Sequence, residues 1–138
     1  MPRGNVQTIR RLLRLPVWAI VGLTANRARP AYGVAAFLQA QGKQIVPVNP
    51  TGETVLGQTG YPDLAAIGFP VDVVEIFRRS DAAGQHVDEA IRAGAGAVWL
   101  QLGVIDEGAA DRAVAAGLDV VMDHCPHIEW PTHGPAHR

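Results

Sequence analysis

The 138-residue chain has a formal net charge of −1, 48% hydrophobic residues and a single cysteine. This length fits one domain that can bury a core without disulfides or metals. The near-neutral charge gives no long-range attraction to nucleic acid or to acidic membranes, and no apolar run reaches the roughly 18 residues of a membrane span. One cysteine excludes an internal disulfide, and no signal-peptide pattern follows the N-terminal arginines, so we expect a cytoplasmic protein.

The first third of the chain predicts a helix, a strand, a second helix and a second strand. Apolar residues recur at helical spacing over residues 7–15 before Pro16, which predicts a helical extension within residues 1–16. An apolar strand over 17–21 ends in a glycine turn. The next helix covers 30–41, opened by Pro30 and ended by Gly42, and leads to a strand over 45–48.

The rest of the chain continues to alternate helices and strands. We expect a short helix at 62–66, strands at 71–76, 96–100 and 118–122, and helices at 80–94 and 106–117. The strands are continuous Val/Ile-rich runs, which is typical of a parallel sheet covered on both faces. The fold class is therefore α/β: a single doubly wound, Rossmann-like domain over residues 17–130 with a five-stranded parallel sheet. Residues 131–138, rich in proline and polar residues, are expected to form a disordered tail.

Ligands of such folds bind at the carboxyl ends of the strands, near the point where the strand order reverses. This rule selects five loops, at residues 22–33, 49–57, 77–80, 101–106 and 123–128. In the first loop a strand leads through a turn to the N-terminus of a helix, where backbone N–H groups and the helix dipole favour phosphate. We therefore predict a phosphorylated ligand beside residues 22–33.

The pattern of an NAD-binding site is incomplete. In a G-x-G-x-x-G motif Gly22 fills the first position, but Thr24 and Arg27 stand where the second and third glycines belong. The second strand ends in Val48, Asn49 and Pro50 without a carboxylate for the ribose hydroxyls. An NAD(P)-dependent oxidoreductase remains an alternative that this pattern disfavours.

Four basic residues lie in loops at this same predicted edge of the sheet: Arg27, Arg29, Arg78 and Arg79. Guanidinium groups bind phosphate through paired donors, so their convergence suits a ligand with several phosphate charges. The alternative is that two or three of them are solvated or pair with Glu75, Asp81 or Asp106.

A set of short motifs runs in order through residues 17–129: AIVGLT at 19–24, RP and YG within 29–33, VPVNP at 46–50, LG at 56–57, DVV at 72–74, FRRS at 77–80, VWLQLGV at 98–104, GLDVVMD at 117–123 and CP at 125–126. By these motifs the chain resembles the stand-alone CoA-binding proteins, which are related to the CoA-binding domain of succinyl-CoA synthetase α subunits. The resemblance implies a Rossmann-like domain that binds coenzyme A, or an acyl-CoA, in an extended cleft.

The resemblance also implies roles for particular segments. Backbone amides of residues 24–27 meet the CoA pyrophosphate, residues 77–80 flank the adenine, and residues 101–103 lie near the pantetheine arm. The expected ligand-binding residues are Gly22, Thr24, Ala25, Asn26, Arg27, Arg29, Pro30, Tyr32, Gly33, Asn49, Pro50, Phe77, Arg78, Arg79, Gln101 and Gly103. The synthetases carry a CoA-contacting lysine after the Val-x-Pro segment, whereas Thr51, Gly52 and Glu53 follow here. The 3′-phosphate would then be met by Arg29, Arg78 or Arg79.

No catalytic constellation emerges from the sequence. The sequence Asp123, His124, Cys125 suggests a nucleophilic Cys125 thiolate activated by His124. Neighbouring residues of an extended segment project to opposite sides, however, so the two side chains should not face each other. We expect neither a catalytic residue nor a metal site, and the function is non-enzymatic binding of CoA or an acyl-CoA. The CoA-binding part of a split acyl-CoA ligase is a further alternative, and a homo-oligomer or a ligase-type partner is left open.

Overall fold

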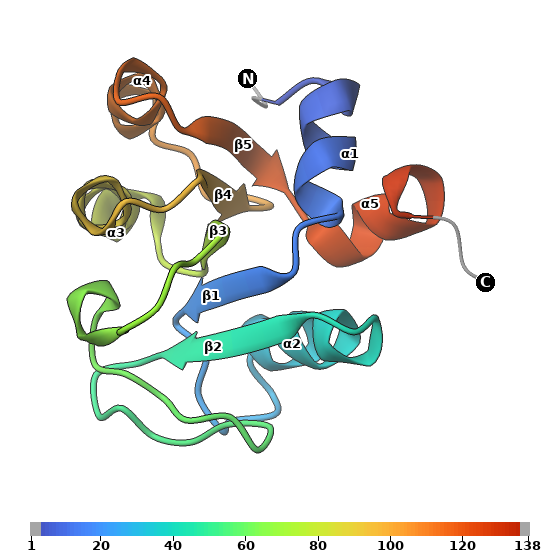
Figure 1. Ribbon diagram of the computed structural model, residues 1–138, viewed down its shortest axis with the longest axis vertical. Coiled ribbons are helices and arrows are strands. Elements are labelled where there is room, and N and C mark those ends of the chain that lie inside the picture. Colours follow the sequence, from blue (N-terminus) through green and yellow to red (C-terminus); the bar gives the residue numbers. More distant parts are fainter. Residues whose placement is uncertain (1–3, 136–138) are drawn as a thin grey trace.

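The computed structural model describes residues 4–135 and shows a parallel sheet between two layers of helices (Figure 1). The five strands are β1 (Val17–Val21), β2 (Gln44–Val48), β3 (Val73–Ile76), β4 (Ala97–Gln101) and β5 (Asp119–His124). Their order across the sheet is β2-β1-β3-β4-β5, with every pair parallel. The predicted fold class is confirmed, and the strand order reverses between β1 and β3.

Each face of the sheet carries its own core and its own helices. Helices α1 (Val6–Leu13), α2 (Pro30–Ala40) and α5 (Pro126–His133) pack on one face. On the opposite face lie the 3₁₀ turn η1 (Leu64–Ala66) and helices α3 (Ser80–Ala93) and α4 (Glu107–Ala115), visible beside one another in Figure 1. Because both faces are covered, the strands are apolar on both sides, which explains their continuous Val/Ile runs. Within residues 4–135 no helix has the length and apolar character needed to cross a membrane.

Local signals set most helix ends. Pro30 stands at the first position of α2, and Gly94 ends α3 in the left-handed conformation with φ of 74°. Asp106 caps α4, since its carboxylate accepts the Ala109 N–H at 3.0 Å. Ser80 is the first residue of α3, and its hydroxyl accepts the N–H of Ile105 at 2.9 Å.

The chain end also differs from expectation. Residues 131–133, assigned from the sequence to a disordered tail over 131–138, belong to helix α5, so that prediction is wrong for them; residues 136–138 lie outside the described part of the chain. Aromatic packing explains the difference. The Phe37 ring of α2 stacks on His127 with centroids 3.9 Å apart and meets Trp130 edge-on at 5.7 Å. The Lys43 ammonium lies 5.3 Å from the Trp130 ring centroid, which adds a cation–π contact.

A carboxyl group is buried in the centre of the sheet. Glu75 of β3 has no exposed surface, and neither carboxyl oxygen has a hydrogen-bond partner within residues 4–135. Its register partners are Ile20 of β1 and Trp99 of β4. Burial, and secondarily the nearby Cys125 thiol, raise the pKa of Glu75 well above its ordinary value of 4.5. The folded protein therefore favours the protonated carboxyl.

Replacing this carboxyl by an amide should stabilise the protein at neutral pH. Because the pKa of Glu75 is raised on folding, the folded state binds the proton more tightly, and stability falls as pH rises above about 4.5. Glu75→Gln removes the titration, so its free energy of unfolding should fall less between pH 5 and pH 8 than that of the wild type. Urea denaturation at both pH values measures this difference.

Asp63→Asn is the matched control, since Asp63 is an exposed carboxylate that caps η1 and asparagine can keep that hydrogen bond. Its pH profile should parallel that of the wild type. Equal pH dependence in Glu75→Gln and the wild type would contradict the assignment of a protonated Glu75.

Candidate ligand-binding cleft

The residues that follow β1 and β3 approach each other more closely than a side chain at position 22 would allow. Gly22 has a φ of 94°, and a Cβ built there would lie 2.5 Å from the carbonyl oxygen of Phe77. The Gly22 N–H donates to the carbonyl of Val48, and the Phe77 N–H donates to that of Val21, both at 2.9 Å. Only glycine satisfies both the positive φ and the close contact. This contact joins the loops on either side of the point where the strand order reverses.

An open cleft of about 910 Å³ lies at this carboxyl edge of the sheet. Ten of the expected ligand-binding residues line it: Gly22, Thr24, Arg29, Pro30, Asn49, Pro50, Phe77, Arg78, Arg79 and Gln101. The residues that sequence reasoning missed are Val21, Ala31, Val48, Pro62, His86, Leu102 and Val104. The cleft thus collects side chains from the ends of β1, β2, β3 and β4, as the rule for doubly wound folds predicts.

Six of the expected residues are not part of the cleft lining: Ala25, Asn26, Arg27, Tyr32, Gly33 and Gly103. The Arg27 guanidinium instead lies 5.5 Å from the Tyr32 ring centroid. Gly103 is a structural anchor, since its N–H donates to the Asp123 carboxylate at 2.7 Å and its carbonyl accepts the Ser80 hydroxyl at 3.4 Å. Whether any of the six contacts a ligand stays a prediction.

The loop after β1 is tied by its own side chains. The Ala25 N–H donates to the Glu53 carboxylate at 2.9 Å, and the Asn26 N–H donates to the Thr24 hydroxyl at 3.3 Å. The Ala28 N–H donates to the Asn26 side-chain oxygen at 3.0 Å. A carboxylate at the Ala25 amide shows that this position accepts an anionic group. A phosphate bound to the Ala25 or Asn26 amide would have to replace the present acceptor.

Asn49 joins the loops after β1 and β2 and is almost completely buried. Its side-chain NH₂ donates to the carbonyls of Leu23 and Glu53, at 3.0 and 3.2 Å. Its side-chain oxygen accepts the Glu53 N–H at 2.8 Å and the Thr51 hydroxyl at 3.3 Å. Although Asn49 lines the cleft, its amide is occupied within the chain, so it shapes the cleft wall.

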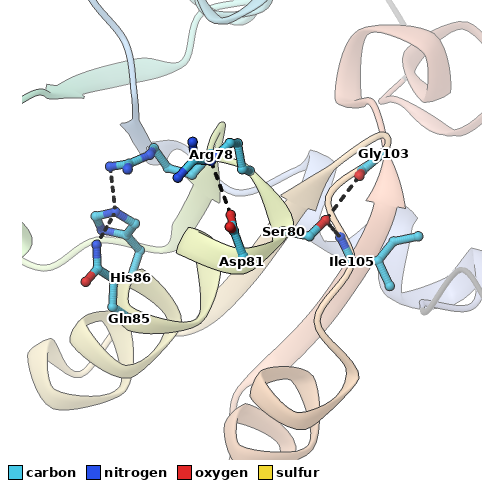
Figure 2. A network of polar contacts seen from close by, with 8 residues as sticks. Arg78, Ser80, Asp81, Gln85, His86, Gly103 and Ile105 are labelled. Carbon is cyan, nitrogen blue, oxygen red and sulfur yellow. Dashed lines mark hydrogen bonds and ion pairs between the residues drawn. The ribbon is translucent and has the colours of Figure 1, made fainter.

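The wall formed by β3 and α3 carries three cationic or titratable side chains (Figure 2). Arg79 pairs with Asp81 at 3.2 Å, as one alternative from the sequence had it, and both side chains are largely exposed. The Arg78 guanidinium instead donates to Nε2 of His86 at 3.2 Å. His86 lies on α3 and also contacts Glu89, through Nδ1 at 2.7 Å. The i,i+3 spacing of His86 and Glu89 is visible in the sequence, but the contact with Arg78 is tertiary.

The floor of the cleft holds an unpaired acceptor. Gln101 ends β4 and lines the cleft, and its side-chain oxygen is buried without a hydrogen-bond partner within residues 4–135. A buried acceptor of this kind is costly unless a donor reaches it. The neighbouring Leu102 is 55% exposed and adds an apolar surface at the mouth.

The Asp123–Cys125 segment lies apart from this cleft. Cys125 is buried in the core on the α1, α2 and α5 face, and His124 Nδ1 lies 3.5 Å from a Glu129 carboxylate oxygen. None of the three residues Asp123, His124 and Cys125 belongs to the cleft lining. In the described part of the chain, no group of three or more His, Cys, Asp or Glu side chains is arranged to hold a metal ion.

Comparison with known proteins fits this architecture. Residues 16–131 match the protein family described as a CoA binding domain. The chain belongs to this family. It is 35% identical over 107 residues to the uncharacterized protein YneT of Bacillus subtilis strain 168, covering 78% of this chain and 79% of that one. A hypothetical protein from Pyrococcus horikoshii OT3 superposes with a TM-score of 0.88 at 32% identity, covering 94% of this chain and 92% of the other.

A larger protein contains the same fold as one part. The dinucleotide-forming acetyl-coenzyme A synthetase 1 of Ca. Korarchaeum cryptofilum, solved with phosphate and ADP, superposes with a TM-score of 0.70 at 22% identity. The match covers 81% of this chain and 26% of the synthetase chain. The fold thus occurs both in small proteins and as part of a longer synthetase chain. The resemblance to CoA-binding proteins read from the sequence motifs is confirmed by the family match.

Removing the Asn49 amide should destabilise the folded protein at the cleft wall. Asn49→Ala breaks two donor and two acceptor contacts at a buried position, and unpaired buried groups cost about 1–3 kcal/mol. We expect the free energy of unfolding in urea to fall by that amount. Thr51→Ala is the control, since it removes only the 3.3 Å hydroxyl contact at an exposed residue. Equal stability of Asn49→Ala and Thr51→Ala would contradict the role of Asn49 as a buried tie.

Proposed function

We propose that this protein binds coenzyme A, or an acyl-CoA, in the cleft at the carboxyl edge of its sheet. The observation that carries the proposal is the cleft itself, a channel of about 910 Å³ at the strand-order reversal in a member of the CoA-binding domain family. CoA is long, carries separate phosphate groups at one end and has a flexible arm with amides at the other. The cleft offers complementary groups for each part.

The charged walls and the polar floor of the cleft support the same ligand. Arg29 lies on the wall formed by α2, and Arg78 and Arg79 lie on the wall formed by β3 and α3. Guanidinium groups on both walls suit a ligand with more than one phosphate. Gln101 lines the cleft, and a turn of its side chain would bring the unpaired oxygen to the N–H of a pantetheine amide, beside the apolar surface of Leu102. The residues present therefore fit the ligand that the family implies.

We further propose that binding is not accompanied by catalysis in this chain. The titratable side chains of the cleft lining are Arg29, Arg78, Arg79 and His86, and the lining contains no carboxylate or thiol. Acid–base or covalent chemistry on CoA needs a nucleophile or a second proton-transfer group. A second candidate function is a CoA-binding part that works with a ligase chain. The synthetase match favours it, since there the fold is 26% of a longer chain.

Calorimetry and thermal unfolding with CoA, acetyl-CoA, NAD and ATP test the binding proposal. A ligand that binds only the folded state stabilises it, by about 2.7 kcal/mol at a concentration 100 times Kd. We expect CoA or acetyl-CoA to raise the melting temperature progressively above Kd, with the logarithm of its concentration. Stabilisation by NAD with none by CoA would overturn the proposal and favour an oxidoreductase. Turnover of an acyl-CoA by the purified chain would overturn its non-enzymatic part.

Gln101→Leu should separate binding from folding. Leucine removes the buried unpaired oxygen, so the variant should be at least as stable as the wild type. If the Gln101 oxygen accepts an amide of the ligand, CoA affinity should fall about 3- to 10-fold, the value of one neutral hydrogen bond. Parallel melting curves and calorimetric titrations with CoA measure both effects.

Gln44→Leu is the matched control, because Gln44 is exposed at the first position of β2, at the opposite edge of the sheet. It should leave CoA affinity unchanged. Unchanged affinity in Gln101→Leu as well would remove Gln101 from the binding site without touching the rest of the proposal.

A further inference from the structure

Arg78 is held in place by two side chains of α3: it contacts His86, as Figure 2 shows, and His86 contacts Glu89. Because a guanidinium only donates hydrogen bonds, Nε2 of His86 is the acceptor in its 3.2 Å contact with Arg78. The proton of the neutral imidazole then sits on Nδ1 and is donated to the Glu89 carboxylate at 2.7 Å. The Gln85 amide also approaches Nε2, at 3.5 Å. Glu89 thus orients His86, and His86 orients Arg78.

This arrangement fixes Arg78 and leaves its charge uncompensated. Within residues 4–135 Arg78 forms no ion pair, since its partner is a neutral ring nitrogen. Arg79, one residue on, pairs directly with the Asp81 carboxylate. His86 and Glu89 are mostly buried, with side chains 14% and 29% exposed, so the support is firmer than a surface pair. An arginine that is held by a neutral acceptor at a cleft wall is ready to receive an anion.

We infer that Arg78, positioned by His86 and Glu89, is the subsite that recognises a terminal monoester phosphate of the ligand. The inference rests on the proposed binding of CoA and assigns its 3′-phosphate to this wall. In CoA the pyrophosphate and the 3′-phosphate leave different carbons of one ribose. On the opposite wall Arg29, at the start of α2, also lines the cleft, so the two phosphate groups have separate cationic partners.

The chemistry favours a monoester over an internal phosphate. A monoester has three terminal oxygens and approaches a double negative charge at neutral pH, whereas each unit of a pyrophosphate bridge has two free oxygens. The planar guanidinium can donate to two of those terminal oxygens while its other nitrogen keeps the contact with His86. Selection of CoA over dephospho-CoA is the expected consequence.

Paired calorimetric titrations with CoA and dephospho-CoA test this assignment in the wild type, Arg78→Gln and His86→Phe. We expect the wild type to bind CoA at least tenfold more tightly than dephospho-CoA, as one charge-assisted phosphate contact provides. Arg78→Gln should bring the ratio of the two affinities close to one. His86→Phe keeps a ring at this position without its nitrogens, so it should lower the ratio of the two affinities.

The controls keep the outcomes distinct. Arg92→Gln removes a cation from the last turn of the same helix and should keep the wild-type ratio. Melting curves verify that each variant is folded, and the wild-type ratio is informative even if one variant is not. Equal affinity of the wild type for both ligands, or an unchanged ratio in Arg78→Gln, would overturn the subsite while CoA binding stands. Absence of binding to either ligand would overturn the proposed function together with this inference.

Discussion

The cleft depends on the close backbone contact between Gly22 and Phe77. A Cβ at position 22 would lie 2.5 Å from a carbonyl oxygen, so the turn after β1 can lie this close to the end of β3 only without a side chain. The chain leaves β1 toward α2 on one face and leaves β3 toward α3 on the other. The contact therefore sets the spacing of two loops that diverge from it, and the space between them is the cleft.

Polar groups around this contact divide into those that build the cleft and those that remain available. Asn49 uses its whole side-chain amide to join two loops, and the Ser80 hydroxyl joins α3 to the loop after β4. By contrast, the Gln101 oxygen is unpaired and Arg78 contacts only a neutral ring. Lining the cleft does not separate the two kinds of group, since Asn49 and Gln101 both line it. They are separated by whether the hydrogen-bonding groups of the side chain are already occupied within the protein.

The sequence predicted the architecture well because parallel strands buried on both faces leave a strong local signal. The helix at 126–133 is not predicted because Pro131 interrupts the helical pattern, and its stability comes from contacts with Phe37 and Lys43 far away in the chain. In the sequence, Glu75 is one candidate partner for an arginine. Side-chain alternation along β3 instead places it with Val73 on the face covered by α1, α2 and α5, and no local rule shows that a carboxyl there lacks a partner.

Ten of sixteen expected site residues line the cleft because the rule for strand ends locates loops, and the loops were predicted correctly. That rule does not say which side chains in a loop face inward. Arg27, for example, does not line the cleft and lies over the Tyr32 ring. His86 lies beyond the loop, on the helix itself, where only the folding of α3 against the end of β3 brings it beside Arg78.

The charge distribution limits how such a site can select its ligand. With a net charge of −1 the protein exerts little attraction at a distance, so recognition rests on contacts made inside the cleft. The groups proposed to make those contacts lie on two walls that belong to opposite faces of the sheet: Arg29 beside α2, and Arg78 with His86 beside α3. A ligand with one phosphate can engage one wall. A ligand whose phosphates are separated by a ribose can engage both, and the second contact adds to the first without the cost of bringing in a second molecule.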